Sequence, residues 1–165
     1  MGRRPRYALR YFVAVCLLLG VSASPAVTPQ LELKDLHGNT HTLLKYRGEI
    51  VVLNFWATWC VACKTEMPIF TEIYHKYRDQ GIIVLAASLD DASTRKYVPQ
   101  YARSYKMEFP VLINAVTENM HQFGLGDTLP STVFLDERGN VMAKISGQAT
   151  RKEILQRLEV MVRSH

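Results

Sequence analysis

The sequence predicts an α/β fold in which helices flank a mixed central β-sheet. Two apolar, β-branched runs at residues 50–56 and 82–88 are typical of strands buried on both faces. The helical pattern between them makes a βαβ unit, which implies parallel strands joined by a right-handed crossover. A later hairpin at residues 132–145 adds antiparallel pairing, and 165 residues are enough for one domain with its own core.

The N-terminal half places a hairpin before the first buried strand and a long helix after it. Leucines alternate through residues 31–36 ahead of the turn signal at residues 37–39, which indicates a hairpin. Residues 60–80 carry apolar side chains at helical spacing, and Gly81 is a typical helix stop. Pro68 lies inside this helix and predicts a kink.

The C-terminal half continues with shorter elements. A helix is expected to begin at Asp90-Asp91, and its packed face would consist of Tyr97, Val98, Tyr101, Ala102 and Tyr105. A strand at residues 109–113 and a short helix at 118–123 follow. The strands at 132–135 and 141–145 flank a turn that contains glycine. The closing amphipathic helix would bury one stripe of side chains: Ile154, Leu155, Leu158, Met161 and Val162.

The positive charge of the chain gathers at its N-terminus. The formal net charge is +5, but Arg3, Arg4, Arg6 and Arg10 all precede the first acidic residue, Glu32. Without these four arginines the chain has 16 basic and 15 acidic residues, a net charge of +1. The charge is therefore no argument for nucleic acid, and we expect no nucleic-acid partner.

Residues 1–26 have the pattern of a targeting segment. A basic start is followed by an apolar stretch from Tyr11 to about Ala23 and by small residues at 21–26 that suit a signal peptidase. The apolar stretch is shorter than the ~20 residues that span a bilayer comfortably. We therefore expect a secretory signal, with an uncleaved membrane anchor as the alternative, and a folded domain at residues 27–165.

Two of the three cysteines, Cys60 and Cys63, form a CxxC motif at the predicted junction of strand and helix, whereas Cys16 lies in the targeting segment. Free backbone N–H groups and the macrodipole at a helix start favour negative charge. Such positions lower the pKa of a cysteine thiol from about 8.5 toward about 7. We therefore expect Cys60 to be a nucleophile and Cys63, one turn into the helix, to resolve the mixed disulfide that it forms.

Two other roles for this pair have less support. A zinc site needs two more ligands, and the sequence has no second CxxC and no HxxxH motif. A purely structural disulfide would close so short a loop that it would restrain the unfolded chain little. We expect a redox-active disulfide between Cys60 and Cys63, with no metal and no other cofactor.

The motif WATWCVACKTEMP at residues 56–68 resembles the active site of the thioredoxin superfamily. With FPVLIN at 109–114 and LPSTVFLDERGNV at 129–141, the chain is similar to the exported TlpA/ResA-type thiol-disulfide oxidoreductases, over nearly all of residues 31–163. The resemblance implies a thioredoxin-like fold with an N-terminal β-hairpin and a central helix-strand insertion, here at residues 90–113.

The resemblance also assigns roles to single residues. Cys60 would be the attacking thiol and Cys63 the buried resolving thiol. Pro130 matches the cis-proline beside the active site. The backbone of the residue before it, here Leu129, would hold an extended substrate segment as an added strand.

The neighbours of the cysteines are expected to differ in role. Trp56 extends the central strand and is expected in the core, whereas Trp59 borders the nucleophile and is expected to form substrate surface. Ala62 occupies a position where many relatives have Pro. The reduction potential of the family therefore cannot be copied to this chain.

Glu66 is the candidate for moving the proton of Cys63. It lies three residues after Cys63 on the apolar stripe of the helix, where a carboxyl is either an acid helped by the helix dipole or a half-buried group with a raised pKa. The resemblance favours the second alternative, a half-buried carboxyl with a raised pKa. Thioredoxin has a buried Asp six residues before its first cysteine, where this chain has Asn54, and an amide cannot take a proton at neutral pH.

The resulting hypothesis is an exported enzyme that reduces disulfides of partner proteins, and we expect it to be a monomer. The resemblance implies a periplasmic setting, with the protein secreted or anchored to the inner membrane by its N-terminal segment. It also implies a membrane thiol carrier as electron donor, and substrates such as apocytochrome c or copper-site proteins.

Two other functions stay open at this stage. A copper-handling module on the same fold would carry the metal on its cysteine pair, usually with a nearby histidine, but none lies next to this CxxC. A thiol peroxidase normally has a peroxidatic cysteine without a second cysteine two residues on.

Overall fold

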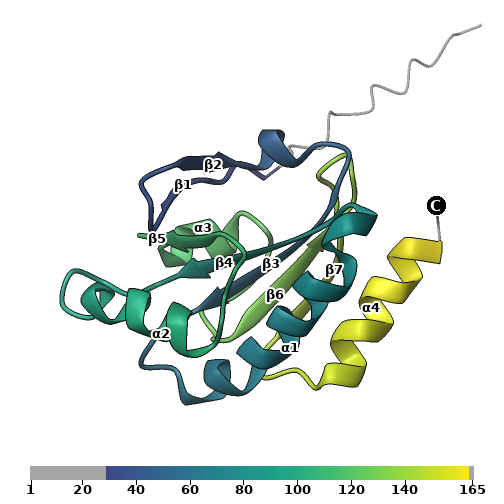
Figure 1. Ribbon diagram of the computed structural model, residues 1–165. Helices are drawn as coiled ribbons and strands as arrows, with labels where there is room; N and C mark the ends of the chain where they lie inside the picture. The colour runs from purple at the N-terminus through teal and green to yellow at the C-terminus, as the bar shows by residue number, and fades with distance from the viewer. Residues whose placement is uncertain (1–28, 164–165) are drawn as a thin grey trace, which may run out of the picture.

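The computed structural model describes residues 29–163, which form a seven-stranded β-sheet with helices on both faces (Figure 1). The targeting segment predicted at residues 1–26 lies outside the described residues, and the boundary at residue 27 stays a prediction. Within the described part of the chain, no helix is both long and apolar enough to cross a membrane.

The sheet is mixed, as predicted. Its strands are β1 (Glu32–Asp35), β2 (Thr40–Thr42), β3 (Ile50–Trp56), β4 (Ile82–Ser88), β5 (Val111–Ile113), β6 (Ser131–Leu135) and β7 (Val141–Ser146). They are ordered β2-β1-β5-β4-β3-β6-β7. β4 runs parallel to β3 and β5, and all other neighbours are antiparallel. The βαβ unit and both hairpins are confirmed, and β5 of the predicted insertion joins the N-terminal hairpin to the rest of the sheet.

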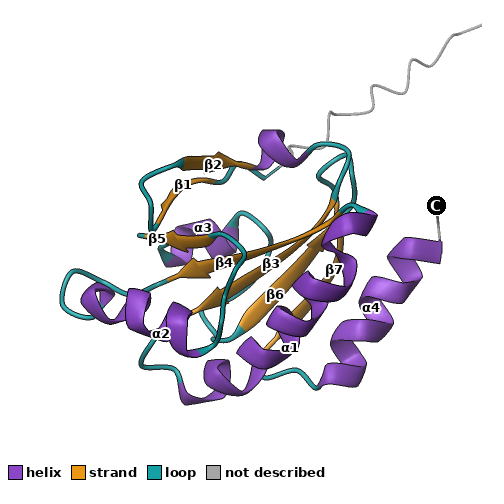
Figure 2. Ribbon diagram, viewed as in Figure 1, coloured by secondary structure: helices purple, strands orange, loops and turns teal. Residues whose placement is uncertain are grey.

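Helices cover both faces of this sheet (Figure 2). They are α1 (Val61–Tyr77), α2 (Val98–Ser104), α3 (Thr117–His121) and α4 (Arg151–Arg163), with the short 3₁₀ helices η1 (Leu43–Tyr46), η2 (Arg78–Gln80) and η3 (Arg95–Tyr97). α1 and α4 lie side by side on one face, where Arg151 pairs with Glu72, and α2 packs on the same face. α3 and η1 cover the opposite face.

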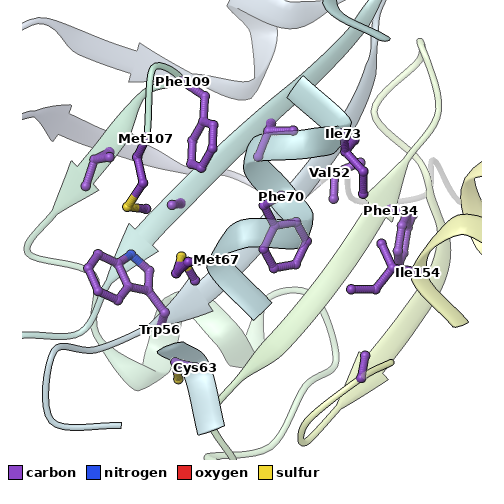
Figure 3. Packing of buried hydrophobic residues seen from close by; sticks show 14 of the residues in the cluster. Val52, Trp56, Cys63, Met67, Phe70, Ile73, Met107, Phe109, Phe134 and Ile154 are labelled. Atoms are coloured by element: carbon purple, nitrogen blue, oxygen red, sulfur yellow. The ribbon is translucent and has the colours of Figure 1, made fainter. Parts of the chain in front are cut away.

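The central strand β3 divides its side chains between two cores. All seven of its residues are buried, because the sheet is covered on both faces. Val52 and Trp56 meet Met67 and Phe70 of α1 on one side (Figure 3). The residues of the strand that alternate with them, such as Leu53, belong to the core under α3. Asn54 shares the register of Val52 and Trp56, so this alternation turns a buried amide toward α1.

The helical segment stops at Gly81, as predicted, although α1 itself already ends at Tyr77. α1 continues through Pro68 as one helix, and the predicted kink stays untested. After the short η2 helix, Gly81 adopts a left-handed conformation with φ of 76°. Glycine reaches this region without strain, and the chain then enters β4.

The prediction of a helix from Asp90-Asp91 is wrong. The Asp91 carboxylate accepts hydrogen bonds from the backbone amides of Ser93 and Thr94, at 2.8 and 3.2 Å, and closes a local turn there. Such turns compete with helix formation, and α2 begins only at Val98, after η3. The predicted packed face is also smaller, because Tyr97 is 46% exposed. In α4, Val162 is likewise 39% exposed and is not part of the buried stripe.

A buried polar cluster holds the N-terminal hairpin together. The Asp35 carboxylate accepts hydrogen bonds from the His37 and Asn39 amides, from the Asn39 side chain, and from His41 Nε2 at 3.0 Å. The other ring nitrogen of His41 bonds to the Tyr46 hydroxyl. Burial alone raises the pKa of Asp35, but the bonds from Asn39, His41 and His37 outweigh burial and hold this pKa well below its usual range.

Replacing His41 should therefore destabilise the protein. His41→Leu leaves a buried carboxylate and hydroxyl without their shared partner, which is expected to lower the free energy of unfolding by about 1–3 kcal/mol. A carboxyl with a lowered pKa contributes stability above its unfolded pKa and loses it as the pH falls through the folded value. The loss in His41→Leu should thus be clear at neutral pH in urea unfolding. His75→Leu, at a histidine whose side chain is 44% exposed, is the control, and equal stability of the two variants would contradict this role.

Candidate active site

The two cysteines lie at the junction of β3 and α1, where the sequence predicts them. Cys60 is the N-cap residue of α1, and its sulfur accepts a hydrogen bond from the Cys63 amide at 3.1 Å. The two residues are joined by a disulfide, and their Cα atoms are 5.3 Å apart. Cys60 is 7% exposed and Cys63 is 0% exposed. Only Cys60 is therefore accessible to a partner's sulfur from solvent.

A buried aspartate fixes the turn that carries Cys60. Asp90, directly after β4, accepts hydrogen bonds from the Thr58 amide at 2.9 Å and from the Thr58 hydroxyl at 2.5 Å. The Ser88 hydroxyl donates to the same carboxylate at 2.7 Å, and Asp90 is only 2% exposed. These bonds tie the loop before Cys60 to the end of the neighbouring parallel strand. The sequence analysis missed this role because it assigned Asp90 to a helix start.

Two loops, one with Trp59 next to Cys60 and one with Leu129, contribute to a groove on the surface. Trp59 is 58% exposed, whereas Trp56 is fully buried, as predicted for a core residue. The Leu129–Pro130 peptide bond is cis, as the resemblance implies. Trp59 and Leu129 line a groove of about 520 Å³. The other lining residues are Leu89, Asp90, Asp91, Arg95, Asn114, Ala115, Val116, Thr117, Glu118 and Asp127.

Glu66 lies one helical turn after Cys63 and is 1% exposed. Its Oε1 accepts a hydrogen bond from the Ala149 amide, in the loop before α4, and its Oε2 accepts one from Asn54 Nδ2 at 3.5 Å. Burial raises the pKa of Glu66 to about 7, against the opposing effect of these two hydrogen bonds. A carboxyl with this pKa can both take and release a proton near neutral pH.

The hydrogen-bond network around Glu66 includes two groups, from Ala149 and Thr132, that could not be identified from the sequence. Ala149 contributes only its backbone N–H. Every residue except proline has this donor, so the identity of the residue does not reveal its role. Thr132 on β6 accepts a second hydrogen bond from Asn54 Nδ2 at 3.0 Å. Within residues 29–163, no group of three or more His, Cys, Asp or Glu side chains is placed to hold a metal ion.

Comparison with known proteins agrees with this geometry. Residues 26–144 match the model of the AhpC/TSA family. The chain belongs to the AhpC/TSA family. It is 37% identical over 134 residues to the thiol-disulfide oxidoreductase ResA of Geobacillus thermodenitrificans, an alignment that covers 81% of this chain and 75% of that protein. It is also 33% identical over 132 residues to the thioredoxin-like protein YneN of Bacillus subtilis, covering 80% and 76% of the two chains.

Solved structures show the same fold. StoA from Bacillus subtilis superposes with a TM-score of 0.66 at 23% identity, over 81% of this chain and 99% of that one. The exposed lipoprotein thioredoxin Etrx1 from Streptococcus pneumoniae superposes with a TM-score of 0.67 at 26% identity, over 79% and 98%. This AhpC/TSA-family chain is thus a thioredoxin-like thiol-disulfide oxidoreductase with a Cys60–Cys63 disulfide.

Replacing Glu66 should change the pH dependence of this enzyme. Above a pH of about 7 Glu66 is ionised and can accept the Cys63 proton, so the rate of mixed-disulfide resolution should rise as the pH passes through this value. Glu66→Gln should remove that rise and slow resolution by about 10²-fold, measured by stopped flow.

Glu72→Gln provides the matched control for this measurement. Glu72 lies on the same helix, but it pairs with Arg151 at the surface and its side chain is 42% exposed. The control should keep the wild-type pH profile. If Glu66→Gln kept that profile too, Glu66 would have no part in proton transfer.

Proposed function

We propose that this oxidoreductase reduces disulfides of partner proteins in an exported setting. The observation that carries the proposal is the unequal burial of the pair: Cys60 reaches the surface at the N-cap of α1, whereas Cys63 is enclosed near a buried carboxyl. This arrangement suits one thiol that attacks and one that resolves. Trp59, which directly precedes Cys60 in the sequence, and Leu129 line one groove, which offers a surface for the partner's chain.

The reaction begins with the reduced enzyme. The Cys60 thiolate attacks one sulfur of the partner's disulfide, which forms a mixed disulfide and expels the partner's second sulfur as a thiolate. Glu66 takes the proton of Cys63. The Cys63 thiolate then attacks the Cys60 sulfur, closes the enzyme disulfide and expels the partner's remaining thiolate. The partner gains two electrons, which the two enzyme thiols lose, and its thiolates take up two protons: the one that Glu66 received from Cys63, and one from solvent, to which Cys60 had released its own.

The setting and the partners belong to the same proposal. The basic and apolar segment at residues 1–26 supports export, with either secretion or anchoring to a membrane. The superposable Etrx1 is an exposed lipoprotein. A membrane thiol carrier would reduce the Cys60–Cys63 disulfide again, and apocytochrome c or copper-site proteins would be the substrates in a periplasm. These partners rest on the family resemblance.

Single cysteine variants test the division of roles. Cys60→Ser should abolish reduction of a protein disulfide such as those of insulin. Cys63→Ser should instead accumulate a mixed disulfide with the substrate, because no second thiol can release it. Non-reducing electrophoresis and mass spectrometry detect that adduct. Full turnover by Cys63→Ala would rule out the two-cysteine mechanism.

The direction of electron flow is tested by the equilibrium potential of the Cys60/Cys63 couple against glutathione. A reductant should have a potential below about −250 mV, and a value near −120 mV would make the enzyme an oxidant instead. Titration with Cu(I) and single-turnover reaction with peroxide should accompany this measurement. Tight copper uptake without disulfide reduction, or fast oxidation by peroxide, would favour the copper-handling or the peroxidase alternative.

A further inference from the structure

The buried amide of Asn54 has no assigned role, although it lies at the centre of the site. Asn54 is 0% exposed and belongs to the face of β3 that packs against α1. Its Nδ2 donates to Thr132 Oγ1 at 3.0 Å and to Glu66 Oε2 at 3.5 Å. Its Oδ1 has no hydrogen-bond partner among the described residues. A buried amide whose carbonyl oxygen lacks a hydrogen-bond partner requires an explanation.

The two ends of an amide suit the two protonation states of a carboxyl. The NH₂ group donates to an ionised carboxylate, whereas the carbonyl oxygen accepts the O–H of a carboxylic acid. A half-turn of the amide exchanges the two ends at almost the same volume. Thr132 permits both orientations, because a hydroxyl can accept from the NH₂ group or donate to the carbonyl.

The other partner of Glu66 lacks this freedom. The Ala149 amide is a backbone N–H, which can only donate, so Oε1 of Glu66 meets a donor in both states. Oε2 instead faces Asn54, whose side-chain amide can offer either a donor or an acceptor. Oε2 is therefore the oxygen that can carry a proton and still be hydrogen-bonded.

We propose that Asn54 is a positioning residue whose amide reverses when Glu66 gains or loses its proton, so that Oε2 accepts and releases the proton of Cys63 without movement of the backbone. The part of this statement that concerns Cys63 rests on the proposed function. The reversal itself does not, since it concerns only the Asn54 amide and the carboxyl of Glu66, and Thr132 bonds to the amide in either orientation.

The surroundings leave few other groups to set the titration of Glu66. The neighbours that bond to it, Asn54 from β3 and Ala149 from the loop before α4, are both uncharged. On α1 the nearest titratable group in sequence is Cys63, which does not titrate while it is in the disulfide. Glu72 of α1 and Arg151 of α4 pair with each other at the exposed edge.

The wild-type oxidised protein provides the first test, without any substitution. The side-chain ¹⁵N–¹H resonances of Asn54 and the ¹³C carboxyl resonance of Glu66 are followed by NMR between about pH 5 and pH 9. This range covers a titration of Glu66 with a midpoint near neutral pH. The amide resonances should shift with the same midpoint as the carboxyl. In Glu66→Gln this shift should vanish. Amide resonances that stay constant while Glu66 titrates would overturn the reversal.

Two variants at Asn54 provide the second test. Asn54→Leu can neither donate nor accept, and its ionised Glu66 loses a donor in a buried site. Glu66 should then bind its proton about tenfold more tightly, which is a rise of about one pH unit in its NMR midpoint. Asn54→Asp places a second carboxyl against the first, so the titration should split into two steps. A wild-type Glu66 titration in Asn54→Leu would contradict the proposal.

Thr132→Val is the matched control in the same buried hydrogen-bond network. It removes the hydroxyl but keeps both ends of the Asn54 amide, so Glu66 should titrate close to its wild-type midpoint. A shift as large as that of Asn54→Leu would contradict the proposal. The pH dependence of the disulfide-exchange rate separates this result from the proposed function. If the Glu66 midpoint moves in Asn54→Leu but this pH dependence does not, Asn54 has the proposed role and Glu66 does not take the proton of Cys63.

Discussion

The structure depends on one constraint, which is that successive side chains of β3 point to opposite faces of a sheet covered on both sides. The strand is wholly buried, and its alternation supplies two separate cores. On the α1 face, Asn54 is the polar member between apolar residues. Because its position follows from the register, the same pattern that builds the core also places an amide under the redox helix.

The accessible sulfur depends on how β3 passes into α1. Thr58 is held by Asp90 at the end of β4, and this clamp leaves Cys60 at the N-cap, where the Cys63 amide donates to its sulfur. The helix then turns Cys63 and Glu66 inward. Neighbouring residues of one short segment thus acquire opposite environments. The difference between a nucleophile that meets its partner and a resolving thiol that stays enclosed arises from this clamped turn together with the geometry of the helix.

The sequence predicted those features that rest on local patterns. The buried strands, the helix between them and its stop at Gly81 follow from periodicity and residue type. The cysteines and Glu66 are visible because they lie on one helix at known spacing. The cis bond at Pro130 came from the family resemblance, since most X-Pro bonds in folded proteins are trans.

The failures have two physical causes, a local turn and contacts between segments far apart in the sequence. Asp91 closes a local turn with the amides of Ser93 and Thr94, and this turn competes with the helix expected from Asp90 onward. Asp90 itself bonds to Thr58, which is 32 residues away in sequence. The Ala149 amide that bonds to Glu66 is 83 residues away and belongs to the backbone. Contacts of this kind depend on tertiary packing, and composition or spacing carries no sign of them.

The position of the acid explains why an amide on β3 is useful. A carboxyl at position 54 would reach the site from the strand, whereas Glu66 reaches it from the helix, one turn after the resolving cysteine. A buried carboxyl with a raised pKa stabilises the fold less and less as the pH rises from its unfolded pKa to its folded value of about 7, so at neutral pH Glu66 is retained at a cost to stability. A second acid at position 54 would add like-charge repulsion to that cost. Like the Ala149 amide, an amide at position 54 donates to the ionised Glu66 and lowers its pKa against the effect of burial, without adding a charge.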